Sequence, residues 1–247
     1  MNDRLRWALA IPLSLAALLY WAPGARAADY VVGVQELDYF PIYATDGTGR
    51  YVGYARELLD LFASTSGHHF EYRALPIKRL VNDYLLGHTD FMFPDNPRWD
   101  AEAKKTLSVR YSAPAVTFQD AVLVLPERRG QPMQSLGSVR GFTPWKFMAQ
   151  VRSGSLSLQE AAGPRNLIQM ALARRVDGIN LARQVADFHL KDMGRPAALV
   201  VDASLLPSTD SQYLLSSIRH PEVVRQFDQF LQTHAPAVGA LKRKYGL

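Results

Sequence analysis

The residues that could perform acid, base, nucleophilic or metal chemistry are scattered along the chain. The 247-residue sequence has no cysteine, which excludes disulfides, thiolate nucleophiles and cysteine-ligated metals. His68 and His69 are adjacent in a segment that alternates like a strand, so their side chains should face opposite ways. Asp95 and Asp100 could pair as carboxylates, although loop acids are usually just solvated. Because P-loop, zinc-protease and serine-hydrolase motifs are missing, we expect no catalytic residue, no metal and no cofactor.

Groups suited to holding a small molecule are more evident. Trp99 and Trp145 are predicted in a loop and at a helix start, where large rings can line a pocket or cover the loop surface. The segment 141–143 precedes Pro144, which suits the first position of a helix. Free N–H groups at a helix start can hold an anion, and the alternative is an ordinary helix capped by Thr143.

Strand-like and helix-like segments alternate in two blocks, which predicts an α/β protein. The first block has the order β-α-β-α-β, at 30–34, 52–65, 69–74, 76–87 and 90–93. Extended segments follow at 108–111 and 121–125, and a second alternation occupies 139–142, 145–151, 156–160, 164–175, 177–181, 184–193 and 198–202. Two helices, 221–234 and 237–245, close the chain. Two such blocks predict two lobes, with ligands at the carboxyl ends of their strands.

The first 27 residues have the three parts of a secretory signal peptide. A basic start precedes an apolar run from Trp7 to Trp21, and a small-residue A-R-A ending closes the segment. The run is shorter than the about 20 residues that a spanning helix needs. We expect cleavage after Ala27 and export to the periplasm, without a lipid anchor because no cysteine can carry the lipid.

The charge of the chain points away from nucleic acid. The formal net charge is +5, and the longest basic runs are Arg128-Arg129 and residues 242–244. So mild an excess does not indicate nucleic-acid binding. We expect a monomer whose partners are a small-molecule solute and a membrane protein.

Six ordered segments carry motifs of one family. They are D-Y-F-P-I-Y at 38–43, G-R-Y-V-G-Y-A-R-E-L-L-D-L-F-A at 49–63, L-L-G-H-T-D-F-M-F at 85–93, R-Y-S-A-P at 110–114, A-R-R-V-D-G-I at 173–179 and L-K-R-K-Y-G at 241–246. Together they resemble the type 2 periplasmic solute-binding proteins of family 3, which includes amino-acid binders of ABC importers. The resemblance implies an α/β, two-lobed fold with a two-crossover hinge. Lobe 1 would be 28–117 with 213–247, and lobe 2 would be 118–212.

Two charged positions differ from the amino-acid binders of that family. The place of their carboxylate-binding arginine falls on Lys105, with Arg98 nearby in a longer loop. The place of their ammonium-binding aspartate falls on Ala182, with Asn180 and Arg183 as polar neighbours. A lysine cannot reproduce the bidentate arginine fork. These differences argue against an α-amino acid and favour a polar or anionic solute.

The resemblance therefore implies a periplasmic solute-binding protein rather than an enzyme, which delivers its solute to an ABC importer. It also implies an aromatic residue from the first turn above the ligand. The candidate ligand-binding residues are Tyr39, Phe40, Trp99, Arg98, Lys105, Gly141, Phe142, Thr143, Trp145, Asn180 and Arg183. Two alternatives stay open: a periplasmic lyase such as cyclohexadienyl dehydratase, which shares the fold, and a module that reports its ligand to a membrane sensor.

Overall fold

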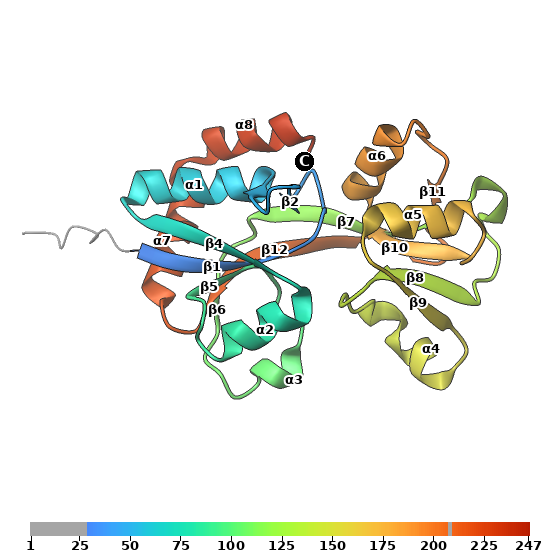
Figure 1. Cartoon of the computed structure of the whole chain (residues 1–247), viewed down its shortest axis with the longest axis horizontal. Coiled ribbons are helices and arrows are strands. Elements are labelled where there is room, and N and C mark those ends of the chain that lie inside the picture. Colours follow the sequence, from blue (N-terminus) through green and yellow to red (C-terminus); the bar gives the residue numbers. More distant parts are fainter. Residues whose placement is uncertain (1–28, 207–208) are drawn as a thin grey trace, which may run out of the picture.

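The computed structural model describes residues 29–206 and 209–247, so the predicted signal peptide lies outside the described residues. The described chain forms two lobes that are joined by two long antiparallel strands, β7 (Val116–Val124) and β12 (Thr209–Ser217) (Figure 1). Among the described residues, no helix combines the length and the apolar character needed to cross a membrane.

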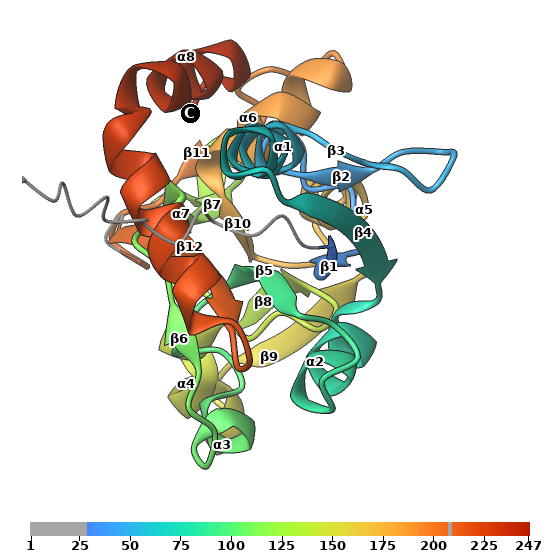
Figure 2. The ribbon, with the colours of Figure 1, turned by 90° about the vertical axis from the view of Figure 1, so that its left-hand side faces the viewer.

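Lobe 1 is a sheet with helices on both faces. Its strand order is β4-β1-β5-β12, in which β1 pairs with β4 and β5 in parallel and β12 runs antiparallel to β5. The strands are β1 (Asp29–Gln35), β4 (His69–Leu75), β5 (Phe91–Asp95) and β6 (Arg110–Tyr111), with a small ribbon of β2 (Ala44–Thr45) and β3 (Tyr51–Val52). The helices are α1 (Tyr54–Ser66), α2 (Ile77–Leu85), α3 (Ala101–Lys104), α7 (Pro221–Thr233) and α8 (Ala235–Tyr245). Helices α1 and α8 lie on the opposite side of the sheet from α2 and α3 (Figures 1 and 2).

Lobe 2 repeats this arrangement on the other half of the same ten-stranded sheet, which is continuous between the lobes because β12 pairs with β7. Its order is β7-β10-β8-β9, in which β8 pairs with β9 and β10 in parallel and β7 runs antiparallel to β10. The strands are β8 (Ser135–Val139), β9 (Ser157–Ala161), β10 (Gly178–Ala182) and β11 (Val200–Val201). The helical segments are η1 (Pro126–Arg128), η2 (Trp145–Phe147), α4 (Met148–Ser153), α5 (Pro164–Leu172) and α6 (Arg183–Asp192).

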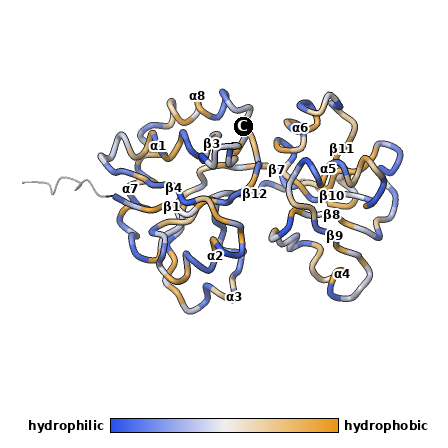
Figure 3. The backbone as a smooth tube through the Cα atoms, viewed as in Figure 1, coloured by the Kyte–Doolittle hydropathy of each residue, from blue (hydrophilic) through white to orange (hydrophobic). Residues whose placement is uncertain are grey.

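Local sequence explains most of these elements. Helix α1 buries Tyr54, Leu58 and Phe62, which recur every four residues, and Gly67 ends it in the left-handed conformation at φ 73°. Hydrophobic and hydrophilic stretches alternate along both lobes (Figure 3), as expected where helices and strands bury one side. Glycine within a strand lets a helix pack closely, because a Cβ on Gly33 would lie 2.5 Å from the Cδ1 atom of Leu80 in α2.

The crossing strands depart from the sequence-based expectation. Residues 209–217 were not predicted as a strand, and their T-D-S-Q-Y-L-L-S-S sequence has no strict alternation. Pairing with β5 and β7 holds this segment extended, so tertiary contacts override its weak local preference. The predicted lobe boundaries lie opposite each other on this ladder, where Thr117 pairs with Gln212 and Phe118 with Ser211.

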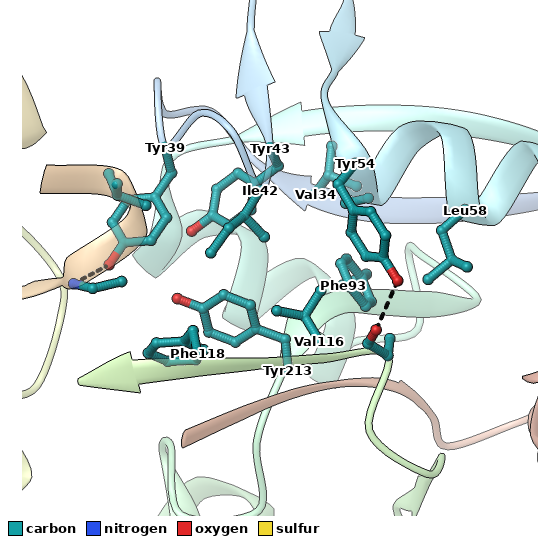
Figure 4. Packing of buried hydrophobic residues seen from close by; sticks show 14 of the residues in the cluster. Val34, Tyr39, Ile42, Tyr43, Tyr54, Leu58, Phe93, Val116, Phe118 and Tyr213 are labelled. Carbon is teal, nitrogen blue, oxygen red and sulfur yellow. Dashed lines mark hydrogen bonds between the residues drawn. The ribbon is translucent and has the colours of Figure 1, made fainter. Parts of the chain in front are cut away.

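The hydrophobic core reaches the junction between the lobes. In Figure 4, Tyr43, Phe118 and Tyr213 pack together beside the crossing strands. The Tyr54 hydroxyl donates a hydrogen bond to the Ala115 carbonyl oxygen at 2.9 Å, which ties α1 to the start of β7. Strand β7 therefore starts from a buried, hydrogen-bonded part of lobe 1, and β12 ends in the same lobe against β5.

Candidate functional site

A cleft lies between the two lobes, and both of them line it. Lobe 1 contributes residues that follow β1 and β5, and lobe 2 contributes residues that follow β8 and end β10. The crossing strands form part of its wall through Phe118, Asp120, Ser211 and Tyr213. These are the carboxyl ends of parallel strands, where ligands of open α/β sheets bind.

Aromatic rings form much of the cleft wall. The rings that line it are Tyr39, Trp99, Phe118, Phe142, Trp145 and Tyr213. Several touch: the centroids of Tyr39 and Phe142 are 5.4 Å apart, those of Trp99 and Tyr213 are 5.6 Å apart, and those of Phe118 and Tyr213 are 4.2 Å apart. Rings in such contact supply a large apolar area with little conformational freedom.

Polar groups interrupt this aromatic wall at a few places. They are Gln35, Asp100, Asp120, Thr143, Asn180 and Ser211. The Oδ1 atom of Asp120 accepts a hydrogen bond from Nδ2 of Asn180 at 2.8 Å. Burial raises the pKa of the Asp120 carboxyl, while the Asn180 hydrogen bond and the nearby charge of Lys146 act in the opposite direction. An apolar pocket with a few placed polar groups is typical of small-molecule sites.

Seven of the eleven candidate residues line the cleft: Tyr39, Trp99, Gly141, Phe142, Thr143, Trp145 and Asn180. Two more lie at the edge of the lobe contact. The guanidinium carbon of Arg98 lies 5.1 Å from the ring centroid of Trp145 in the opposite lobe. Phe40 packs on Phe188 at 4.5 Å and belongs to a separate surface hollow beside α8.

The other two candidates, both basic, do not line the cleft. Lys105 is an exposed residue after α3, and its Nζ atom pairs with Glu102 at 2.7 Å. Arg183 begins α6, and its Nε atom lies 3.4 Å from Asp187 on the exposed side of that helix. The anionic expectation depended on these two residues together with Arg98, so the cleft lining is less basic than expected.

The expected helix start after Gly141 is also different. The chain turns at Gly141 with φ 87°, and a three-residue 3₁₀ turn, η2, follows Pro144 without a side-chain cap from Thr143. This turn leads directly into α4 at Met148, so the helix predicted at 145–151 is present, but its first turn is 3₁₀ and no side chain caps it. Gly141 instead matters for close approach, because a Cβ there would lie 3.2 Å from the Cβ atom of Ile77 in lobe 1.

Asp95 does not pair with Asp100 across the cleft. It is fully buried in lobe 1, where it accepts hydrogen bonds from the Lys104 Nζ atom at 2.5 Å and the Ser216 Oγ atom at 2.6 Å. Burial raises the pKa of Asp95, and Lys104 opposes this shift. The pair is therefore part of the lobe 1 core.

Contacts between the lobes hold the cleft closed on one side. The Tyr39 hydroxyl oxygen accepts a hydrogen bond from the Ala182 N–H at 3.3 Å (Figure 4). Both residues are buried, at 2% and 1% exposure. Because Tyr39 belongs to lobe 1 and Ala182 to lobe 2, this hydrogen bond exists only when the lobes are together.

A buried histidine lies at the same junction. His189 in α6 has no hydrogen-bond partner for either ring nitrogen among the described residues, and its Nε2 atom lies 3.9 Å from Oδ1 of Asp38 in lobe 1. Burial lowers the pKa of His189, and Arg165 acts in the same direction. Asp38 and Asp192 act in the opposite direction. The neutral ring is therefore favoured in this arrangement.

The residues that sequence reasoning missed lie mainly on the crossing strands. Asp120 could have been detected, because it is a lone acid between Phe118 and the apolar run A-V-L-V, and acidic side chains are seldom buried in a strand unless they have a partner. Ser211 and Tyr213 carried no such signal, because β12 itself was not predicted. Gln35 ends β1 at 4% exposure and accepts a hydrogen bond from the Tyr43 hydroxyl.

Comparison with known proteins identifies the fold. No protein-family model and no curated protein sequence matches the chain. A histidine kinase sensor domain with similarity to periplasmic binding proteins matches with a TM-score of 0.70 at 16% identity, covering 87% of this chain and 95% of that one. An ancestral arginine-binding protein bound to arginine matches with a TM-score of 0.70 at 16% identity, covering 90% and 99%.

A third similar structure is an ancestral amino acid-binding protein that is a precursor of cyclohexadienyl dehydratase. Its TM-score is 0.66 at 16% identity, with 88% of this chain and 95% of that chain covered. The chain therefore has the two-lobed α/β fold of the periplasmic binding proteins, and the predicted fold class is confirmed. At these identities the likeness concerns the fold.

Proposed function

We propose that this protein captures a small polar solute in the cleft between its lobes and releases it unchanged. The observation that carries the proposal is a single aromatic-walled cleft to which both lobes and both crossing strands contribute side chains. A solute in such a place touches both lobes at once. It therefore stabilises the closed arrangement over any open one, since only the closed arrangement offers both sets of contacts.

We also propose that the protein is exported and delivers its solute to an ABC importer. The signal-like sequence of residues 1–27 supports export, and the resemblance of six ordered segments to importer binding proteins supports delivery. In this proposal residues 28–117 and 213–247 form lobe 1, residues 118–212 form lobe 2, and β7 and β12 bend during closure.

Export and binding can be tested with one preparation. The full chain is expressed with its leader, and the protein is recovered from a periplasmic extract. An N-terminus at Ala28 is the expected result, and an uncleaved chain retained with the membrane would contradict export. The purified protein is then screened by thermal unfolding against a library of small metabolites.

A bound solute should raise the unfolding temperature. At 100 times its dissociation constant it adds about 2.7 kcal/mol, which corresponds to roughly 5–11 °C for a chain of this size. Trp99→Ala should reduce this shift, whereas Lys105→Ala, outside the cleft, should leave it unchanged. Conversion of prephenate or arogenate by the purified protein would overturn the binding role in favour of the lyase alternative.

A further inference from the structure

The continuous sheet ends in a free edge in each lobe, at β4 and at β9. In Figure 2, β4 is the outermost strand of lobe 1, and within the described chain it pairs with β1 alone. The ribbon of β2 and β3 leaves a surface hollow beside residues 69–72 and does not pair with them. An edge of this kind can add a strand from another chain, because its outward backbone groups are unpaired.

One hydrogen bond shows which backbone groups of β4 point outward. The Glu36 N–H donates to the Leu75 carbonyl oxygen at 2.9 Å, so the backbone groups of Leu75 point toward β1. Backbone groups alternate between the two edges of a strand, so those of Phe70, Tyr72 and Ala74 point away from β1. These three residues have no backbone hydrogen-bond partner on that side among the described residues. They are therefore available to a further strand.

Strand β4 lacks the features that usually protect such an edge. Its sequence, H-F-E-Y-R-A-L, contains no proline and no lysine, and its register with β1 is continuous, without a bulge. Its carboxylate and its guanidinium belong to Glu71 and Arg73, on either side of Tyr72. Glu71 is exposed and has no ion-pair partner among the described residues. Arg73 donates a hydrogen bond to the His88 carbonyl oxygen at 3.0 Å and has no acidic partner there.

This pattern is self-complementary in one antiparallel register. When two copies pair about a two-fold axis at Tyr72, the outward groups of Tyr72 meet their own copies, and those of Phe70 meet those of Ala74. Glu71 of each copy then lies opposite Arg73 of the other at a non-hydrogen-bonded position, where side chains are closest. Centring the pairing on residue 71 or 73 instead places two like charges opposite each other, which is unfavourable. The charges therefore select one register.

We propose that β4 is a homodimerisation edge, at which two copies of this chain join their sheets by antiparallel pairing centred on Tyr72. The edge strand of lobe 2 does not offer such pairing, because Glu160 is the one charged residue of β9 and has no opposite charge to meet. No residue of β4 lines the cleft, so the proposal does not depend on solute binding. A contact of one strand from each copy is small, so the dimer should dissociate on dilution. It differs from the monomer expected from the sequence because only the strand order reveals the free edge.

Sedimentation velocity of the purified protein, in a dilution series from about 1 mM downward, measures this association. We expect a reversible dimer. Glu71→Arg places an arginine opposite Arg73 at both symmetric positions, and it should weaken dimerisation at least about fivefold. The double variant Glu71→Arg with Arg73→Glu exchanges the two charges and should restore wild-type dimerisation. The matched control is Glu102→Arg, which makes the same change at an exposed position of α3 and should leave dimerisation unchanged.

Cysteine trapping tests the register, because the chain contains no cysteine of its own. Position 71 of one copy lies opposite position 73 of the other, within the distance that a disulfide spans. A mixture of Glu71→Cys and Arg73→Cys should therefore form disulfide-linked dimers on mild oxidation, whereas neither variant alone should. Three results would overturn the proposal: a protein that is monomeric at every concentration, dimerisation that Glu71→Arg does not weaken or the double variant does not restore, and equal cross-linking in the mixture and in either variant alone. Circular dichroism checks that each variant is folded.

Discussion

Removal of the Tyr39 hydroxyl should weaken solute binding by loosening closure of the lobes. The change is Tyr39→Phe, which keeps the ring against Phe142 and removes the acceptor for the Ala182 N–H. A neutral intramolecular hydrogen bond contributes about 0.5–1.5 kcal/mol net. The donor–acceptor distance of 3.3 Å is long, so we take about 1 kcal/mol. The lost free energy destabilises the closed state only, because in an open cleft water would hydrogen-bond to the Tyr39 hydroxyl and to the Ala182 N–H. The dissociation constant of the solute should therefore rise about fivefold.

The assay for Tyr39→Phe is calorimetric titration with whichever solute the thermal screen identifies, combined with small-angle scattering to follow closure. Tyr51→Phe is the control, because Tyr51 is also buried in lobe 1 but its hydroxyl has no hydrogen-bond partner among the described residues. Its removal should leave affinity unchanged. An unaltered dissociation constant for Tyr39→Phe, or an equal loss in both variants, would refute the role of this hydrogen bond in closure.

Two further predictions concern stability. Lys104→Met leaves the Asp95 carboxylate without its cationic partner in the lobe 1 core, and it should lower the free energy of unfolding, measured in urea, by about 3–5 kcal/mol. The double variant that also carries Asp95→Asn should recover part of the lost stability. A loss below about 1 kcal/mol for Lys104→Met would contradict this prediction. Because burial lowers the pKa of His189, the unfolded chain, with a histidine pKa of about 6.5, binds the proton that the native chain excludes. This contribution to stability should be complete above about pH 7.5 and decline as the pH falls through about 6.5. His189→Gln should flatten the dependence between about pH 7.5 and about pH 5.5, and equal slopes in variant and wild type would count against it.

Much of the fold could be predicted because its signals are local. Leu58, Leu59 and Phe62 lie on one face of a helix by their spacing alone, and α1 forms at Tyr54–Ser66, close to the predicted 52–65. The alternation of strands and helices also predicted two lobes, because each βαβ unit packs its helix on its own sheet. These inferences succeed because the periodicity of buried positions is written into neighbouring residues.

The composition of the cleft was decided by the tertiary structure. Arg183 and Lys105 have the same charge in the sequence as in the fold, but α6 and α3 turn them toward solvent and local acids. Asp120 and Tyr213 are almost a hundred positions apart in the chain, and they share one wall because β7 pairs with β12. The sequence by itself determined that strands, helices and two lobes form, since these follow from contacts between near neighbours. The charge of the binding surface depends on which residues from distant segments meet, and only the packing of the two lobes settles that.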